Sequence, residues 1–149
     1  MSACIAYKEE RIEQLPFKSK KPKAPHYVIA VGIIWKDDHI LIARRKQTSM
    51  LGGLWEFPGG KQQSQETLEE TVVRETKEET DIDISVEVKY QPIQHAYTHF
   101  KITMYAFKCV YKKGIAKPKA SDEIKWIPFH SIRSYPLPKA NLKILDIIG

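Results

Sequence analysis

The segment Gly60–Ile82 reads GKQQSQETLEETVVRETKEETDI, and it is the most informative stretch of the sequence for the fold and for the candidate site. Ser64 has the short hydroxyl side chain that helix N-caps favour. The residues that follow it are acidic, as is typical of a first helical turn. These features predict a helix over Gln65–Thr80.

One face of this predicted helix is both apolar and acidic. In a helical projection with Leu68 at the origin, Val72 lies at about 40°. Glu75 and Glu79 continue the stripe at about −20° and +20°, and Glu78 lies roughly 60° to one side of it. An inward-facing carboxylate is costly unless it is paired or binds a metal, and Mg²⁺ favours carboxylate oxygens and phosphates. The pattern therefore points to three carboxylates around a divalent cation.

The alternative is an ordinary solvated helix whose charges pair along its surface, for example Glu70 with Arg74. The wider spacing argues against it. Chance would produce the same identities at the same separations about once in 10⁷ starting positions. The residues that make up this spacing are Gly60, Glu66, Arg74, Glu75, Glu78 and Glu79.

This spacing resembles the box of the Nudix hydrolases, G-x5-E-x7-R-E-U-x-E-E-x-G-U, in which U is an apolar residue. The sequence departs from it at Thr76, where an apolar residue is usual, and at Asp81, where glycine is usual. Asp tolerates the left-handed backbone that favours glycine after a helix. The resemblance implies an α/β protein, a Nudix-type α/β/α sandwich with a mixed sheet.

The resemblance also implies a metal site and its support. Mg²⁺, with Mn²⁺ as an alternative, would stabilise charge on phosphate oxygens and activate a water for in-line attack on phosphorus. The implied ligands are the Gly59 carbonyl and the catalytic candidates Glu75, Glu78 and Glu79. The implied supports of the loop–helix motif are Gly60, Glu66 and Arg74.

The general base stays open at this point. The carboxylates of the box are one choice. Asp122 and Glu123, which precede an apolar strand-like run at Ile124–Ile127, are another. The competing interpretation of Asp122 and Glu123 is a polar turn without catalytic function.

Segments outside the box indicate which branch of the Nudix hydrolases the chain resembles. Ile42–Arg45 (IARR), Leu51–Lys61 (LGGLWEFPGGK) and Tyr135–Leu145 (YPLPKANLKIL) resemble MutT-type 8-oxo-dGTP diphosphatases. They resemble even more closely the C-terminal domain of the adenine glycosylase MutY, which recognises 8-oxoguanine in DNA. His95–Ile102 (HAYTHFKI) is similar to the F-S-H region of MutY.

By this resemblance four residues would bind the substrate. Asn141 would hydrogen-bond the oxidised guanine, since its amide offers a donor and an acceptor side by side. Phe57 would form an apolar wall, Arg45 would contact a phosphate or the base, and Thr98 would lie near the base. The alternative for Asn141 is helix capping next to Pro138.

The remaining pattern predicts a layered α/β or α+β domain over residues 26–149. Apolar and β-branched runs predict strands, and Asp37-Asp38 predicts a hairpin turn. The glycine-rich segment Leu51–Gly60 predicts a shaped loop around a short aromatic strand. A last helix is expected near Pro138. The expected strands cover His26–Ile34, Ile40–Ala43, parts of Ile82–Tyr111 and Ile124–Ile127, and the last helix would carry Leu142, Leu145 and Ile148 at helical spacing.

Residues 1–25 form a polar, basic segment that predicts an extended N-terminal arm or linker. It looks like the seam in MutY where the iron–sulfur glycosylase domain ends, with Cys4 at the position of the last cluster ligand. No second cysteine in the arm can join it, so no cluster is expected. The chain is then a free-standing relative of the MutY C-terminal domain or a fragment of a longer protein.

Composition sets the broad class. The 149 residues are 42% hydrophobic and 28% charged, which suits one soluble domain without a membrane segment or a secretory signal, and a cytoplasmic location is expected. Two cysteines argue against a disulfide framework or a zinc site. The formal charge of +6 suits a nucleotide or nucleic acid, but it serves plain solubility equally well.

Three functions stay open from the sequence. The first is Mg²⁺-dependent hydrolysis of 8-oxo-dGTP to the monophosphate and pyrophosphate, which would sanitise the nucleotide pool. The second is a binding module that recognises 8-oxoguanine in DNA, as a partner in DNA repair. The third is hydrolysis of another nucleoside triphosphate. The oligomeric state is left open.

Overall fold

The structure is a computed structural model that describes residues 25–49 and 51–148. Most of the predicted N-terminal arm, including Cys4, lies outside the described residues. Within them, no helix has the length and apolar character needed to cross a membrane.

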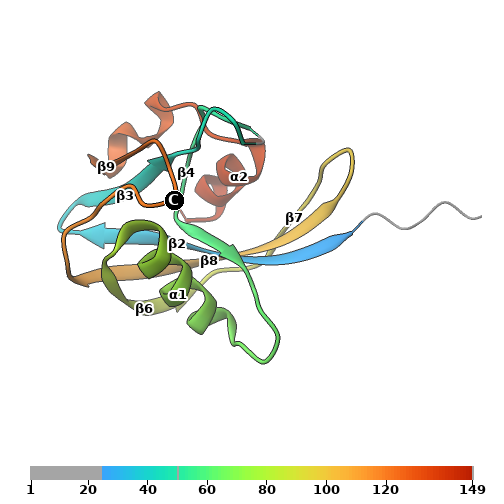
Figure 1. Cartoon of the computed structure of the whole chain (residues 1–149), viewed down its shortest axis with the longest axis horizontal. Helices are drawn as coiled ribbons and strands as arrows, with labels where there is room; N and C mark the ends of the chain where they lie inside the picture. The colour runs from blue at the N-terminus through green and yellow to red at the C-terminus, as the bar shows by residue number, and fades with distance from the viewer. Residues whose placement is uncertain (1–24, 50, 149) are drawn as a thin grey trace, which may run out of the picture.

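The described chain forms a mixed eight-stranded sheet between helices (Figure 1). The strands follow the order β4-β3-β2-β8-β6, with β5 paired to β2, β7 to β8 and β9 to β3. Long strands β2 and β8 run parallel, and the other pairs are antiparallel. The elements are β2 (His26–Lys36), β3 (His39–Arg44), β4 (Trp55–Glu56), β5 (Gly59–Lys61), α1 (Leu68–Thr80), β6 (Asp83–Lys89), β7 (Ile93–Ala96), β8 (Lys101–Lys113), β9 (Glu123–Pro128), the 3-10 helix η1 (Phe129–Ser134) and α2 (Lys139–Ile148).

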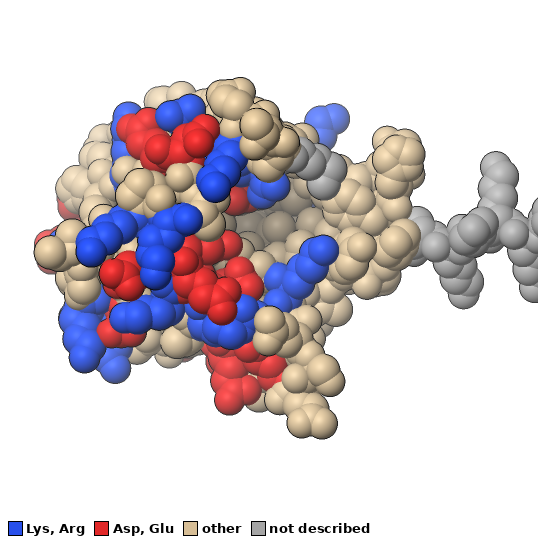
Figure 2. All heavy atoms as spheres, viewed as in Figure 1, with Lys and Arg blue, Asp and Glu red and all other residues tan. Residues whose placement is uncertain are grey.

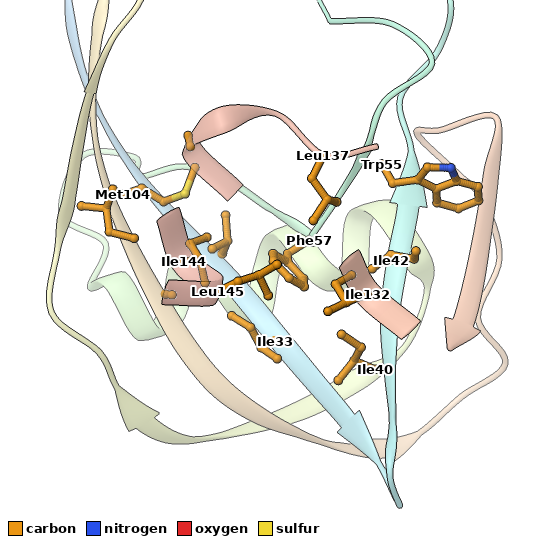
Figure 3. Packing of buried hydrophobic residues seen from close by; sticks show 14 of the residues in the cluster. Ile33, Ile40, Ile42, Trp55, Phe57, Met104, Ile132, Leu137, Ile144 and Leu145 are labelled. Atoms are coloured by element: carbon orange, nitrogen blue, oxygen red, sulfur yellow. The ribbon is translucent and has the colours of Figure 1, made fainter. Parts of the chain in front are cut away.

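Two apolar clusters lie on opposite faces of the sheet. One packs under α1 and includes Val72, Phe107 and Cys109. The other packs against η1 and α2, and in Figure 3 the ring of Phe57 lies among the labelled side chains of this cluster. Both faces of β2 and β8 are therefore buried, which explains their nearly continuous apolar sequences. The α/β/α sandwich with a mixed sheet is confirmed.

The alternation predicted for β8 is present. Ile102, Met104 and Ala106 are buried and face the α2 side of the sheet. The hairpin between β2 and β3 also turns at Asp37-Asp38 as expected, and Asp37 has the left-handed φ of 58° that such a turn uses.

The predicted start of the acidic helix was wrong by one turn. Gln65 has a φ of 64°, outside the helical region, and α1 begins at Leu68. Thr67 is the N-cap: its hydroxyl accepts the Glu70 N–H at 3.0 Å, while the Glu70 carboxylate accepts the Thr67 N–H at 2.8 Å. This capping box satisfies two end groups at once, so it outcompetes the single hydroxyl of Ser64.

The segment Leu51–Gly60 contains the expected short aromatic strand, since Trp55–Glu56 pairs with β3 as strand β4. The packed face expected for the last helix needs correction. In α2 the buried residues are Ala140, Asn141, Ile144 and Leu145. Leu142 is 37% exposed, so it lies beside the packed face of this helix and not on it.

Candidate active site

Strand β5 lies close to both β2 and α1 because it contains two glycines. A Cβ at Gly59 would collide with the Ala30 carbonyl oxygen on β2, and a Cβ at Gly60 would collide with the Glu75 carboxylate. A side chain at Gly59 would require β2 to move, whereas one at Gly60 would displace the Glu75 carboxylate. The glycines thus bring the backbone of β5 against the acidic face of α1.

Glu66 and Arg74 join the preceding loop to the helix. The Arg74 guanidinium donates to both Glu66 oxygens, from Nε at 2.6 Å and from Nη2 at 3.1 Å. Glu66 Oε1 also accepts the Gln63 N–H at 3.1 Å and the Thr71 hydroxyl at 2.8 Å. These bonds, the one from Arg74 first, lower the pKa of Glu66 to about 2. The Glu70–Arg74 pair of the alternative, solvated-helix interpretation is absent among the described residues, because Glu70 caps the helix.

Arg74 also holds two of the predicted metal ligands. Its Nη1 donates to Glu75 Oε2 at 2.6 Å and to Glu78 Oε1 at 3.2 Å. The Glu75 side chain is 17% exposed and that of Glu78 is 58% exposed. Contact with three carboxylates raises the pKa of Arg74, with Glu66 as the largest cause.

Glu79 has a different environment. It is largely buried, and burial, together with the charges of Glu56 and Glu75, raises its pKa to about 8. The Gly59 N–H donates to Glu79 Oε1 at 3.2 Å and partly offsets this rise. Glu79 is therefore a largely buried carboxyl group with other carboxylates as neighbours. Among the described residues, no lysine or arginine forms an ion pair with it.

The oxygen ligands of this site suit a hard cation, but the carboxylates are not grouped around one point in this structure. Repulsion between Glu79 and its carboxylate neighbours is what a divalent ion would relieve. Within the described ranges, however, no three acidic, histidine or cysteine side chains are grouped closely enough to hold an ion. The reason is that Glu75 and Glu78 both form ion pairs with Arg74. Metal binding would require these two side chains to turn away from Arg74.

Asp122 and Glu123 pair with an arginine on β3. Glu123 Oε1 lies 3.3 Å from Arg44 Nη2, and Asp122 Oδ2 lies 3.9 Å from Arg44 Nη1. Asp122 also accepts the Gln47 N–H at 3.3 Å. These contacts attach the loop after β3 to the start of β9, which favours the structural interpretation of both residues over the general base.

A cavity of about 430 Å³ lies on the α2 side of the sheet. Figure 2 shows a recess in the surface beside a group of acidic side chains. The cavity borders the acidic site through Glu56, whose charge acts on Glu79, and through Lys61 at the end of β5. Its lining residues are Tyr27, Ile29, Arg45, Leu51, Glu56, Lys61, Tyr97, Phe100, Ile102, Met104, Pro138 and Asn141.

Two of the predicted substrate-binding residues line this cavity. Arg45 does so while its Nη1 donates to Glu56 Oε1 at 2.8 Å. Asn141 is buried, and its Oδ1 accepts the Phe57 N–H at 3.2 Å. Asn141 lies inside α2, so the capping alternative is wrong.

The other two lie elsewhere. The Phe57 ring is 2% exposed and belongs to the apolar cluster, so it does not form the expected wall. Thr98 is exposed in the turn between β7 and β8. Its neighbours Tyr97 and Phe100 line the cavity instead, with their ring centroids 4.8 Å apart.

Sequence reasoning missed Glu56, Tyr27, Tyr97 and Phe100. Glu56 had a usable signal, because it is a charged residue between Trp55 and Phe57, both buried aromatics on the same short segment. Tyr97 and Phe100 lie in the His95–Ile102 segment that resembles MutY, but nothing local in the sequence connects them with Tyr27. They meet only because β2 pairs in parallel with β8, a pairing that places Tyr27 beside Ile102.

Comparisons with known proteins agree with this geometry. The model of the NUDIX domain family matches residues 30–146. The 8-oxo-dGTP diphosphatase of Proteus vulgaris is 36% identical over 98 residues, 64% of this chain and 88% of that protein. The CTP pyrophosphohydrolase of Escherichia coli (strain K12) is 29% identical over 118 residues, 79% of this chain and 87% of that protein. The crystal structure of the MutT protein from Methanosarcina mazei Go1 has a TM-score of 0.75 at 25% identity, covering 85% of this chain and 94% of that one.

Proposed function

Because the chain belongs to the NUDIX domain family and is a Nudix hydrolase, we propose that it hydrolyses an oxidised purine nucleoside triphosphate, 8-oxo-dGTP, with Mg²⁺. The products would be the nucleoside monophosphate and pyrophosphate. The observation that carries the proposal is the shared border of the acidic site and the aromatic cavity at Glu56 and Lys61. One substrate could place its phosphates over the carboxylates and its base in the cavity.

The chain's own residues would divide the work. Glu75, Glu78, Glu79 and the Gly59 carbonyl would hold Mg²⁺ or Mn²⁺, which supplies charge stabilisation at the phosphates and an activated water. Lys61 lies beside the cavity and would offer a cation to a phosphate oxygen. Arg74 would keep Glu66 and thereby hold the loop against α1 when its other carboxylates turn to the metal. Tyr97 and Phe100 would provide aromatic surface to the base.

A substrate panel tests this proposal. Pyrophosphate release is followed from 8-oxo-dGTP, dGTP, dATP, dCTP and CTP, first with Mg²⁺ and then with excess chelator. We expect the highest kcat/KM for 8-oxo-dGTP and loss of turnover on chelation. Turnover of CTP alone, as the name of the Escherichia coli relative suggests for that protein, would replace the substrate assignment. Turnover that survives chelation would reject the metal.

A second candidate function is recognition of 8-oxoguanine in DNA. A recess of about 270 Å³ has His26, His95, Lys101 and Lys143 in its wall and no acidic residue among the described residues that line it. Burial and the nearby charges of Lys143 and Lys139 lower the pKa of His95, as expected where cations gather without carboxylates. The exposed turn at Thr98 adjoins β7 on the same hairpin.

Gel-shift titrations at two salt concentrations test this second candidate. Lesion-containing and undamaged duplexes are compared, and binding by phosphate contacts should weaken steeply as salt rises. Equal affinity for both duplexes would reject lesion recognition. Lys143→Ala should weaken duplex binding and leave hydrolysis of 8-oxo-dGTP intact, which separates this surface from the hydrolytic site.

A further inference from the structure

The orientation of the Asn141 amide is set by the backbone. The Phe57 N–H can donate only to an oxygen, and the acceptor at 3.2 Å is Asn141 Oδ1. The Asn141 NH₂ group therefore points away from this bond. Within the described part of the chain it has no hydrogen-bond acceptor, and Asn141 lines the cavity. The cavity wall thus contains a hydrogen-bond donor that is unpaired among the described residues.

Glu56 supplies the complementary group. Its Oε1 accepts from Arg45, whereas its Oε2 accepts no hydrogen bond from the described residues. The side chain is 27% exposed and faces the same cavity as Asn141. An acceptor that is largely withdrawn from water is costly unless a donor reaches it. A ligand that enters this cavity would replace water as the source of that donor.

The donor and the acceptor select among the nucleic-acid bases. Guanine presents the O6 acceptor followed by two donors, N1–H and the 2-amino group. Adenine and cytosine present a lone pair where guanine has N1–H, so a carboxylate would face another acceptor there. Uracil and thymine present a single donor between two oxygens. Among these edges, only that of guanine meets a carboxylate with two adjacent donors.

We propose that Glu56 determines base specificity by accepting hydrogen bonds from N1–H and the 2-amino group of a guanine base, beside the Asn141 contact to O6 that the family resemblance implies. This inference rests on the proposed function, and it names the residue that selects guanine. Oxidation at C8 leaves this edge unchanged, so Glu56 selects guanine and other contacts read the lesion. Arg45 then acts as a positioning residue that holds the Glu56 carboxylate.

Removal of a single amino group from the ligand tests the contact directly. Calorimetric Kd values are measured for dGMP and for dIMP, which lacks the 2-amino group, with metal-free protein. We expect wild type to favour dGMP by roughly tenfold to a hundredfold, the range of a hydrogen bond to a charged group. In Glu56→Gln the ratio should fall to within about threefold, because the Gln NH₂ opposes the donors of guanine.

Two further variants make the result specific. Glu87→Gln removes a carboxylate from exposed strand β6, outside the cavity, and should keep the wild-type ratio. Asn141→Asp keeps the acceptor for Phe57 but loses the donor to O6. Since dGMP and dIMP share O6, this variant should weaken both ligands by the same factor. It also tests the edge assignment if Glu56→Gln does not fold.

The outcomes separate the inference from the function on which it rests. A wild-type ratio near one, or a ratio unchanged in Glu56→Gln, overturns the role of Glu56 even where 8-oxo-dGTP is hydrolysed. Absence of guanine nucleotide binding together with turnover of another triphosphate overturns both proposals. A collapsed ratio in Glu56→Gln, with equal weakening of both ligands in Asn141→Asp, supports the guanine edge.

Discussion

Glu66 and Glu79 lie at opposite ends of the same acidic motif, and the fold treats these two carboxylates in opposite ways. Glu66 accepts four hydrogen bonds, two of them from Arg74, and its pKa falls to about 2. Glu79 accepts a backbone hydrogen bond from Gly59 and lies beside other carboxylates, and its pKa rises to about 8. A fully bonded carboxylate is suited to support, and an underbonded buried one is suited to bind a cation.

The largest expected effect comes from neutralising the underbonded carboxylate. Glu79→Gln keeps the shape and the acceptor for the Gly59 N–H but removes the charge. We expect kcat/KM for the hydrolysed triphosphate to fall roughly 10² to 10⁴-fold, as for the loss of one central catalytic group. Glu70→Gln is the matched control, because Glu70 only caps α1. Equal losses in both variants would show that helix stability, and not the site, was changed.

The supporting carboxylate is tested through its partner. Arg74→Lys keeps one positive charge but cannot make the two parallel bonds to Glu66, because lysine is a single-point donor. We expect a fall in kcat/KM of roughly tenfold to a hundredfold, the cost of slightly misplacing a catalytic group. The β5–α1 loop should also become more accessible to proteases. If kcat/KM in Arg74→Lys equals that of wild type, the two parallel bonds from Arg74 to Glu66 do not support the site.

Sequence reasoning found the chemistry of α1 because that chemistry is local. Glu66, Arg74 and Glu79 are tied by helical spacing within one segment, and the left-handed C-cap at Asp81, with a φ of 67°, also followed from local rules. The cavity could not be found in this way. Tyr27, Tyr97 and Asn141 come from three distant segments, so only the sheet topology brings them together.

Local competition explains the smaller errors. Ser64 was a reasonable N-cap, yet the reciprocal bonds of Thr67 and Glu70 moved the helix start. Phe57 was expected at the base because of the resemblance to MutT-type proteins. Its ring packs in the core instead, since complete burial of an aromatic ring gains more than partial burial in the wall of an open cavity.

The pH dependence of stability distinguishes the two carboxylates without substrate. The pKa of Glu79 rises from 4.5 in the unfolded chain to about 8 in the metal-free fold. Its contribution is therefore complete below pH 4.5 and is lost as the pH rises through 8. Melting temperatures of wild type and Glu79→Gln with chelator should agree near pH 4.5. Above pH 8.5 the Gln variant should melt about 5 °C or more higher. Mg²⁺ should close this gap by stabilising wild type alone.

The smallest effect concerns two buried threonines on the same helix. Thr71 and Thr76 are both fully buried, and the Thr71 hydroxyl donates to Glu66 and lies within hydrogen-bonding distance of the Thr67 carbonyl. Thr76 Oγ1 is fully shielded from solvent and has no hydrogen-bond partner among the described residues. Thr76→Val should therefore stabilise the protein by about 1 kcal/mol, since it removes an unsatisfied hydroxyl at constant shape.

Thr71→Val should instead destabilise the protein by about 1 to 2 kcal/mol, because it removes a donor from the Glu66 network. Urea unfolding of both variants measures the difference, with the same slope expected in each. Changes of opposite sign in the free energy of unfolding would extend the contrast between the two carboxylates to the side chains that surround them. A loss of stability in Thr76→Val would mean that this hydroxyl is bonded in solution, and that the acidic face of α1 is better satisfied than its contacts indicate.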